Sequence, residues 1–247
     1  MTRILIVGAT SAIAAACARE WLQKGNCEFV LAGRNPERLA QLQQDLKARG
    51  ARKAEVWSFD LNNNNDGSGL VENAVHVLGQ LDIVLVAPGT LPDQALCQQD
   101  AQLAVQEFTN NSTAVIALLT PLANQLEQQR CGRLAVISSV AADRGRPSNY
   151  VYGAAKAALA TFCSGLRARL SKAGVSVTLI KPGFVRTPMT AGLPLPEKLV
   201  ASPEQVASQI VNAIERGQAC RYTPGFWRYI MLIIRLIPDA VFRRLSL

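Results

Sequence analysis

The sequence predicts an α/β domain built on a doubly wound parallel sheet of about seven strands, with helices on both faces. Short apolar runs rich in β-branched residues alternate with amphipathic or alanine-rich segments from residue 3 to residue 223. Such alternation is typical of a parallel sheet. The first run, 3–7, passes through Gly8 directly into an alanine-rich segment. The 247 residues are 49% hydrophobic and 18% charged, which is the balance of a globular protein with a sizeable core.

Each element is expected from local patterns along the chain. One helix stops at Gly25 and the next opens at Pro36, as glycine and proline commonly mark helix ends. The polar segment 62–69 is expected to be a loop. We expect strands at 3–7, 27–32, 53–59, 81–87, 133–138, 175–180 and 219–223. We expect helices at 12–24, 36–49, 70–79, about 100–129, 151–170 and 201–217.

A serine, a tyrosine and a lysine follow the fifth strand at a spacing suited to proton transfer. Ser139 comes directly after 133–138, and Tyr152 and Lys156 lie one turn apart on one face of the next helix. A nearby ammonium group favours a phenolate, so we expect Lys156 to lower the pKa of Tyr152 from its usual value of about 10. Ser139 would hold a carbonyl or hydroxyl oxygen within reach of the Tyr152 hydroxyl.

The first strand, turn and helix have the form that binds a dinucleotide. The turn contains Gly8, Thr10 and Ser11, and the helix that follows would aim its N-terminal amides at a diphosphate. Arg34 follows the second strand with no acidic residue beside it. An acidic group there is typical of NAD(H) sites, whereas arginine matches the 2′-phosphate of NADP(H). The sequence therefore favours NADP(H); the alternatives are a solvated turn arginine and a strand–helix junction that binds nothing.

Together these features resemble the short-chain dehydrogenase/reductase family over nearly the whole chain. The resemblance implies a Rossmann-type fold in which Tyr152 transfers a proton, Lys156 binds the nicotinamide ribose and Ser139 positions the substrate oxygen. Asn111 stands in an Asn-x-x-Ala that is similar to the family's Asn-x-x-Gly. The resemblance implies that this asparagine holds a water of the proton relay, with Asn110 as the alternative register.

The resemblance also implies a set of cofactor contacts. Asp60 would contact the adenine amino group, and the Pro-Gly-x-x-x-Thr motif that begins at Pro182 would lie beside the nicotinamide. Val185 and Thr187 would contact the carboxamide of that ring. The expected cofactor-binding set is Gly8, Thr10, Ser11, Ala12, Ile13, Arg34, Asp60, Leu61, Ala87, Pro88, Gly89, Tyr152, Lys156, Pro182, Gly183, Val185 and Thr187.

The cofactor half departs from the family pattern in two places. Ala12 and Ala14 stand where the family turn, Gly-x-x-x-Gly-x-Gly, has glycine. The methyl group of Ala12 is expected to face the cofactor, and that of Ala14 the helix–strand contact. The family commonly has Asn-Asn-Ala-Gly where this chain ends its fourth strand without asparagine, at Gly89. These departures leave open a non-catalytic nucleotide-binding module, although the retained serine, tyrosine and lysine favour an enzyme.

We divide the chain into a domain of residues 1–225 and an extension of residues 226–247. The segment 216–247 holds six arginines and one aspartate, so it carries much of the net charge of +8. Its arginine-free apolar run, 229–234, is far too short to cross a bilayer. Aromatic residues with flanking arginines are typical of an interfacial helix on anionic lipid. A helix packed on a partner subunit is the alternative, and the charge favours the membrane.

Gly89 and the segments 144–157, 179–189 and 226–245 also resemble reductases that act on a decaprenylphosphoryl 2-keto-pentose in cell-wall arabinan synthesis. This resemblance implies NADPH-dependent reduction of a ketone to a secondary alcohol, with a polyprenyl-phosphate-linked keto-sugar as the favoured substrate. A soluble ketone and a 3-oxoacyl thioester are the alternatives. The proline-containing segment 188–200 is expected to be the substrate lid.

Several other classes of function are disfavoured. The six scattered cysteines are expected to be reduced core residues, and the single histidine, His76, argues against a histidine-based metal site. No signal peptide is expected, because the first apolar run leads into a glycine turn. Aromatic or helical recognition features for nucleic acid are lacking. We therefore expect a cytoplasmic homodimer or homotetramer that binds no nucleic acid and reaches the cytoplasmic membrane face through residues 226–247.

Overall fold

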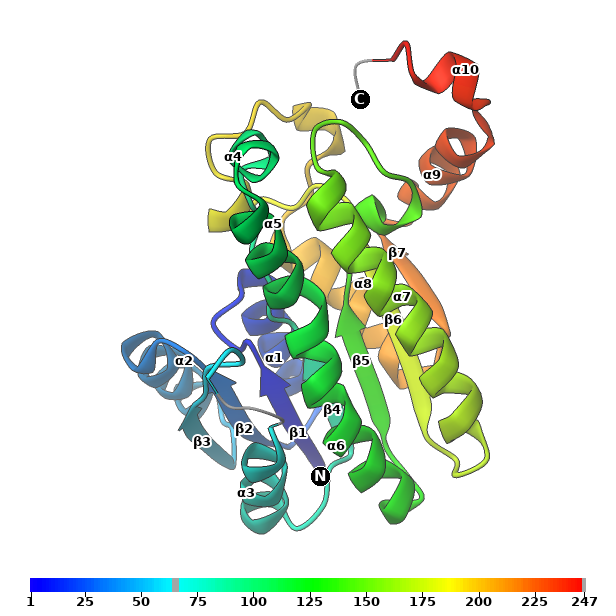
Figure 1. The fold of residues 1–247 in the computed structure, drawn as a ribbon. Coiled ribbons are helices and arrows are strands. Elements are labelled where there is room, and N and C mark those ends of the chain that lie inside the picture. Colours follow the sequence, from blue (N-terminus) through cyan, green and yellow to red (C-terminus); the bar gives the residue numbers. More distant parts are fainter. Residues whose placement is uncertain (64–66, 246–247) are drawn as a thin grey trace.

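The computed structural model describes residues 1–63 and 67–245, and its centre is one parallel sheet (Figure 1). The strands lie in the order β3-β2-β1-β4-β5-β6-β7, and every neighbouring pair is parallel. The order reverses between β1 and β4, where doubly wound sheets bind ligands. The expected strands are therefore confirmed as β1 (Thr2–Val7), β2 (Cys27–Gly33), β3 (Lys53–Ser58), β4 (Ile83–Val86), β5 (Arg133–Ile137), β6 (Ser176–Pro182) and β7 (Cys220–Thr223).

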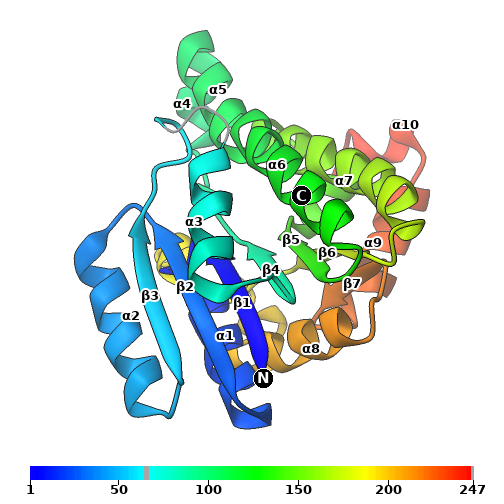
Figure 2. The same ribbon diagram turned by 90° about the horizontal axis from the view of Figure 1, so that it is seen from below.

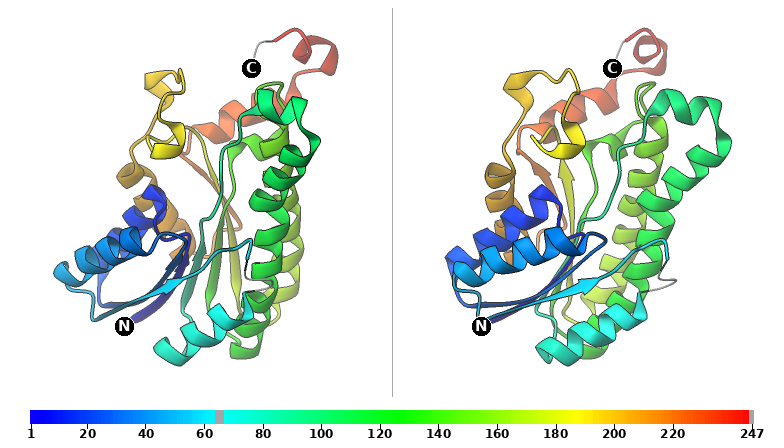
Figure 3. Two further views of the ribbon diagram at one scale, coloured as in Figure 1. Left: turned by 60° about the vertical axis from the view of Figure 1, so that its left-hand side comes forward. Right: turned by 90° about the vertical axis from the view of Figure 1, so that its left-hand side faces the viewer.

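Helices cover both faces of this sheet, as expected (Figures 2 and 3). Because side chains alternate along a strand, β1 sends Ile4 and Ile6 into one core and Leu5 and Val7 into the other. The core around Ile4 is covered by α1 (Ala12–Lys24), α2 (Pro36–Ala48) and α8 (Pro203–Glu215). The core around Leu5 is covered by α3 (Ser68–Leu78), α6 (Ala114–Gln129) and α7 (Tyr150–Ser171).

The segment before β5 differs from the single long helix that the sequence predicts. It is divided into α4 (Gln94–Gln99), α5 (Ala101–Phe108), a π-helical turn (Thr109–Thr113) and α6. Asp93 and Asp100 start α4 and α5, because their carboxylates accept backbone N–H groups of the first turn. In the π-helical turn, the Asn111 side chain donates to the carbonyl of Glu107 at 3.0 Å. Helix α4, which was not predicted from the sequence, therefore begins at an aspartate N-cap, Asp93, that can be seen in the sequence.

Two smaller expectations also need correction. Helix α3 begins at Ser68, inside the segment 62–69 that was expected to be a loop, and residues 64–66 of that segment lie outside the described residues. All six cysteines are free, as expected, but Cys131 and Cys220 are exposed rather than part of the core. Cys131 lies just before β5 and Cys220 is the first residue of β7, where the sheet opens to solvent.

The extension, described as far as residue 245, folds into α9 (Trp227–Leu236) and α10 (Asp239–Phe242) beyond β7 (Figure 1). Trp227 is buried and packs on Gly183 so closely that a Cβ atom added there would lie 1.9 Å from the indole Nε1. Its ring also meets the Phe184 ring edge-on, with centroids 4.9 Å apart. The first turn of α9 is thus fixed to the turn that follows β6.

Arg144 holds the other end of α9 in place. Its guanidinium donates to the carbonyl oxygens of Ile234 at 2.7 Å and Ile237 at 2.5 Å, and pairs with Asp239 at 2.6 Å. These carbonyls belong to the end of a helix, where unpaired oxygens and the helix dipole both favour a cation. None of the helices within 1–63 and 67–245 is both long and apolar enough to span a membrane.

Candidate active site

A cavity of about 1210 Å³ lies at the carboxyl end of the sheet. Its lining comes from the segments that follow β1 to β6, from α4 and α7, and from the segment 188–200 (yellow in Figure 3). Every residue that was expected to bind the cofactor lines this cavity. Two of the four residues expected to be catalytic, Tyr152 and Lys156, line it. Ser139 and Asn111 do not line it, but Ser139 is hydrogen-bonded to Tyr152, and Asn111 accepts the N–H of the lining residue Thr90.

The turn after β1 is built around a close backbone approach. Gly8 has a positive φ of 75°, and a Cβ atom added there would lie 2.7 Å from the backbone nitrogen of Pro88. Ser11 precedes α1 in an extended conformation, and its side chain makes no capping hydrogen bond with α1. The amides at the start of α1 are therefore available to a ligand diphosphate. Ala12 lines the cavity and Ala14 is fully buried in the core, as their places in the turn predict.

Two arginines line the cavity beyond the end of β2. Arg34 follows β2 and is exposed at the rim. Arg38 lies one turn further, in α2, and its Nη2 donates to the carbonyl of Thr10 at 3.1 Å. Sequence reasoning missed Arg38, although its spacing of four residues from Arg34 across the start at Pro36 was a usable signal. The open helix end, the Gly8 turn and this arginine pair fit a phosphorylated dinucleotide.

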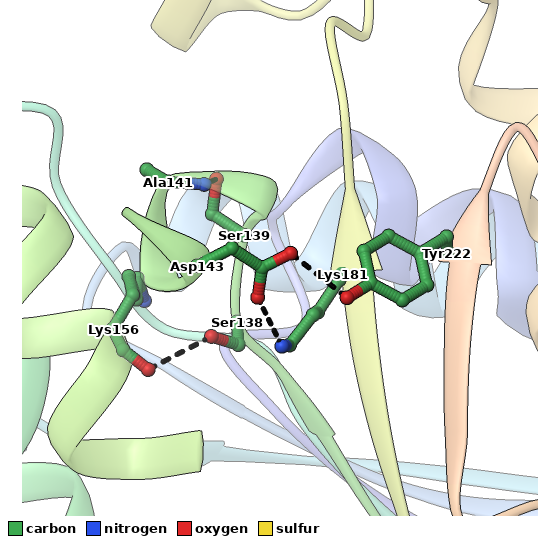
Figure 4. A network of polar contacts seen from close by, with 7 residues as sticks. All are labelled: Ser138, Ser139, Ala141, Asp143, Lys156, Lys181 and Tyr222. Atoms are coloured by element: carbon green, nitrogen blue, oxygen red, sulfur yellow. Dashed lines mark hydrogen bonds and ion pairs between the residues drawn. The ribbon is translucent and has the colours of Figure 1, made fainter. Parts of the chain in front are cut away.

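Ser139 and Tyr152 are held together by contact between α7 and the 3-10 turn Val140–Asp143. The hydroxyl of Ser139 accepts the N–H of Ala141 at 3.1 Å (Figure 4). The same hydroxyl is hydrogen-bonded to Tyr152. Gly153 makes this contact possible, because a Cβ atom there would lie 2.9 Å from the carbonyl oxygen of Ala141. The spacing of Tyr152 and Lys156 on one helix face is as expected, with the ammonium 5.5 Å from the tyrosine ring centroid.

The expected lowering of the Tyr152 pKa is wrong. Loss of hydration raises the pKa of Tyr152 to about 12, although the hydrogen bond with Ser139 by itself lowers this pKa. The same loss of hydration lowers the pKa of Lys156 to about 8. Lys156 is only 3% exposed. Burial therefore outweighs the attraction between the two groups, keeps the phenol protonated at neutral pH and brings the ammonium close to titration.

Asn111 lies behind Lys156, across Gly89. A Cβ atom on Gly89 would lie 3.0 Å from Lys156 Nζ and 3.1 Å from Asn111 Oδ1. Asn111 is fully buried, accepts the N–H of Thr90 at 3.1 Å and donates to the Thr90 hydroxyl at 2.9 Å. The neighbouring Asn110 lines the cavity instead. The π-helical turn thus places Asn111 on the side of the lysine and Asn110 in the lining of the cavity.

A buried polar network that sequence reasoning missed supports the turn after Ser139. The carboxylate of Asp143 pairs with the ammonium of Lys181 and accepts the Tyr222 hydroxyl at 2.8 Å (Figure 4). Burial, and then the hydrogen bond to Asp143, raise the pKa of Tyr222. Below this network, the Ser138 hydroxyl donates to the carbonyl of Lys156 at 3.1 Å. The ends of β6 and β7 are therefore linked to the segment that carries Ser139.

The Pro-Gly turn after β6 forms another part of the cavity lining. The Thr190 hydroxyl donates to the carbonyl of Val185 at 2.6 Å and accepts the N–H of Thr187 at 3.1 Å, so the turn is closed on itself. The expected lid segment continues the lining with residues 188–191 and 193–195, most of which are apolar. Within residues 1–63 and 67–245, no group of three or more potential metal-ligating side chains comes together.

A model of the short chain dehydrogenase family matches residues 2–198. The chain belongs to this family. It is 37% identical to an uncharacterized oxidoreductase of Mycobacterium tuberculosis (strain ATCC 25618 / H37Rv) over 98% of this chain and 96% of the relative. It is 33% identical to an uncharacterized oxidoreductase of Streptomyces coelicolor over 98% of this chain and 95% of that one.

Solved structures share the fold of this short-chain dehydrogenase. Levodione reductase superposes with a TM-score of 0.82 at 17% identity, over 92% of this chain and 98% of that one. A single-residue variant of the actinorhodin polyketide ketoreductase, solved with NADPH, gives 0.80 at 20% identity, over 91% and 96%. The protein is therefore an NAD(P)-dependent dehydrogenase or reductase with a Rossmann-type sheet.

Gly153→Ala is expected to disturb the contact between α7 and the turn after Ser139. The new methyl group would lie 2.9 Å from the Ala141 oxygen, so the turn must move and take the Ser139 hydroxyl with it. We expect turnover to fall at least tenfold and the free energy of unfolding to fall by about 1–3 kcal/mol. Gly165→Ala in the same helix is the control, because a Cβ atom there meets nothing within 4 Å. Wild-type turnover and stability in Gly153→Ala would contradict this view of the contact.

Proposed function

We propose that the protein is an NADPH-dependent reductase that converts a ketone to a secondary alcohol, with Tyr152 as the proton donor. The observation that carries the proposal is the position of Tyr152, hydrogen-bonded to Ser139 and beside Lys156, in the wall of a cavity that also contains the dinucleotide-type turn. The ketoreductase of similar fold that was solved with NADPH supports the same class of reaction.

The bound cofactor would supply hydride to the carbonyl carbon. The Tyr152 hydroxyl would then give its proton to the carbonyl oxygen, so that hydride and proton together make the alcohol. Its raised pKa, about 12, suits this role because the phenol is fully protonated at neutral pH. The Ser139 hydroxyl would orient the carbonyl oxygen. The Lys156 ammonium would hold the ribose hydroxyls and stabilise the phenolate left behind, and Asn111 would hold a water that returns the proton.

We propose NADP(H) rather than NAD(H) as the cofactor because of Arg34 and Arg38. Both arginines line the part of the cavity where the adenosine would lie. No acidic side chain follows β2 within the turn that carries Arg34. Guanidinium groups bind phosphate oxygens in a planar, charge-assisted way. The adenine would lie against Asp60, and the nicotinamide carboxamide against Val185 and Thr187.

We favour a polyprenyl-phosphate-linked keto-sugar as the substrate, with residues 1–225 as the catalytic domain and residues 226–247 as a membrane contact. The apolar lid over the cavity, with Met189, Leu193 and Leu195, would suit a lipid chain. A soluble ketone and a 3-oxoacyl thioester remain the alternative substrates. A non-catalytic nucleotide-binding module, suggested by Ala12, is the alternative to an enzyme. A homodimer or homotetramer is the assembly that we propose.

The membrane proposal rests on the outer face of α9. Trp227, Met231 and their neighbours face the domain, whereas the opposite stripe is apolar and exposed. This exposed stripe consists of Tyr229, Leu232, Ile233 and Leu236, at helical spacing. Exposed arginines 228, 235, 243 and 244 surround it. Apolar side chains ringed by cations match an anionic lipid surface, where each arginine contributes about 1 kcal/mol.

Tyr152→Phe tests the reductase proposal. Removing the hydroxyl leaves the carbonyl without its proton donor, so we expect turnover to fall by a factor of about 10² to 10⁴ while NADPH affinity stays within twofold. Steady-state kinetics with a panel of ketones and a fluorescence titration with NADPH measure the two effects. Tyr150→Phe is the matched control, because Tyr150 is exposed and does not line the cavity. Full turnover in Tyr152→Phe would refute the assignment.

Arg34→Ala and Arg38→Ala test the cofactor preference. Loss of a charge-assisted contact with the 2′-phosphate should weaken NADPH binding about tenfold to hundredfold and leave NADH binding unchanged. Arg49→Ala, at the far end of α2 and paired with Asp45, is the control. If the wild-type protein binds NADPH and NADH with equal affinity, the NADP(H) proposal is refuted. Failure to bind any nucleotide would favour the view that Ala12 prevents binding.

Vesicle flotation tests the membrane contact. We expect the protein to float with phosphatidylglycerol vesicles and much less with phosphatidylcholine, and the double variant Leu232→Glu/Ile233→Glu to lose flotation. The control introduces the same change at two exposed apolar residues elsewhere, Leu96→Glu/Val105→Glu, and should still float. If the wild type does not float, and the tail variant instead turns an oligomer into a monomer on size exclusion, the exposed stripe is a subunit interface.

A further inference from the structure

The cavity lining includes three polar side chains with unsatisfied atoms. Gln94 comes from α4, and Arg146 and Asn149 come from the segment that leads into α7. Gln94 Nε2, Arg146 Nε and Asn149 Oδ1 are all buried, and none has a hydrogen-bond partner among the described residues. Buried polar atoms are rarely left in this state, so a cluster of three in one cavity indicates a ligand that pairs with them.

Gln94 is a fixed hydrogen-bond donor. Its side chain is 8% exposed, and its Oε1 accepts the backbone N–H of Val151 at 3.0 Å. Because a backbone N–H can only donate, this bond determines which end of the carboxamide is the oxygen. The Nε2 group is therefore the end left for a ligand. Val151 directly precedes Tyr152, so Gln94 is attached to the first turn of the helix that carries this tyrosine, and both residues line the same cavity.

Arg146 brings a positive charge that its surroundings do not neutralise. Burial lowers its pKa, and the nearby Asp143 opposes that effect. Asp143, however, is already paired with Lys181 and hydrogen-bonded to Tyr222. Within the described chain, Arg146 itself forms no ion pair. Asp93 also lines the cavity, but its carboxylate caps α4.

Asn149 adds a neutral group to this charge. It precedes the first residue of α7 without capping the helix, and it stands three residues before Tyr152. Its free carboxamide oxygen requires a donor, such as a hydroxyl group. A guanidinium and an amide N–H that line one cavity favour an oxyanion, and the carboxamide oxygen of Asn149 in the same cavity favours a hydroxyl.

We propose that Arg146, Gln94 and Asn149 form a recognition subsite for the anionic group of a polyhydroxylated ketone, with phosphate as the group that fits best. Arg146 and Gln94 bind the phosphate oxygens, and Asn149 accepts a hydroxyl of the same molecule. The subsite rests on the proposed reductase function, since it lies in the same cavity. A phosphate of this kind occurs both in a free sugar phosphate and in a phosphodiester-linked lipid headgroup.

The test is calorimetric binding to the NADP⁺-loaded protein, with two polyols that differ only in the phosphate. We expect ribitol 5-phosphate to bind at least ten times more tightly than ribitol, because only the first has an oxyanion. Arg146→Gln and Gln94→Leu should each abolish this preference, and Arg146→Lys should keep part of it, since the charge remains without the planar fork. NADPH affinity should be unchanged in all three variants. Arg186→Gln, an exposed arginine outside the cavity, is the matched control.

A third ligand separates the two sources of the phosphate. If farnesylphosphoryl ribose binds more tightly than ribitol 5-phosphate, and Arg146→Gln weakens the binding of farnesylphosphoryl ribose, the subsite recognises a lipid-linked phosphodiester. If ribitol 5-phosphate binds more tightly, the subsite recognises a free sugar phosphate. Equal binding of ribitol and ribitol 5-phosphate, no binding of either phosphate compound, or a preference that survives Arg146→Gln would overturn the proposal. These outcomes are independent of the Tyr152→Phe result, which alone decides whether the protein is a reductase that uses this tyrosine.

Discussion

The burial of Lys156 is the constraint on which the rest of the site depends. Lys156 is 3% exposed, so its ammonium group has lost most of its hydration, and its pKa falls to about 8 as a result. The surrounding chain is shaped to allow this. Gly89 leaves space for Nζ, and the π-helical turn Thr109–Thr113 brings the Asn111 oxygen to the same place. The Ser138 hydroxyl fixes the backbone of the lysine from the other side.

The same close packing connects the turn after Ser139 to the C-terminal helices. Gly153 lets α7 meet the turn after Ser139, and Asp143 ties that turn to β6 and β7. Arg144, in the next position, holds the end of α9, while Trp227 at its start lies against Gly183. A helix with an exposed apolar face is therefore attached both to the turn after Ser139 and to the Pro-Gly turn after β6. Anything that binds this face contacts a helix that is packed directly on these two turns.

The sequence predicted what depends on local pattern and left out what depends on distant contacts. Strand and helix positions, the bounds of α1, and the common face of Tyr152 and Lys156 follow from nearby residues. The link between Asp143 and Tyr222, 79 residues apart, has no local signal, and neither has the burial of Gln94. The pKa of Tyr152 was predicted in the wrong direction because pair attraction can be read from spacing, whereas desolvation requires the folded surroundings.

The most direct measurement is the pKa of Lys156 itself in the protein without ligands. Carbon-13 NMR of lysine-labelled protein follows each Cε signal with pH, and the Lys156→Met variant identifies the signal that disappears. Because burial lowers the pKa, Lys156 should be mostly protonated at pH 7 and titrate at about 8. A Lys156 pKa at the ordinary value of about 10.4 would mean that the ammonium group is hydrated. It would contradict the claim that Lys156 is buried and held in place at the centre of the site.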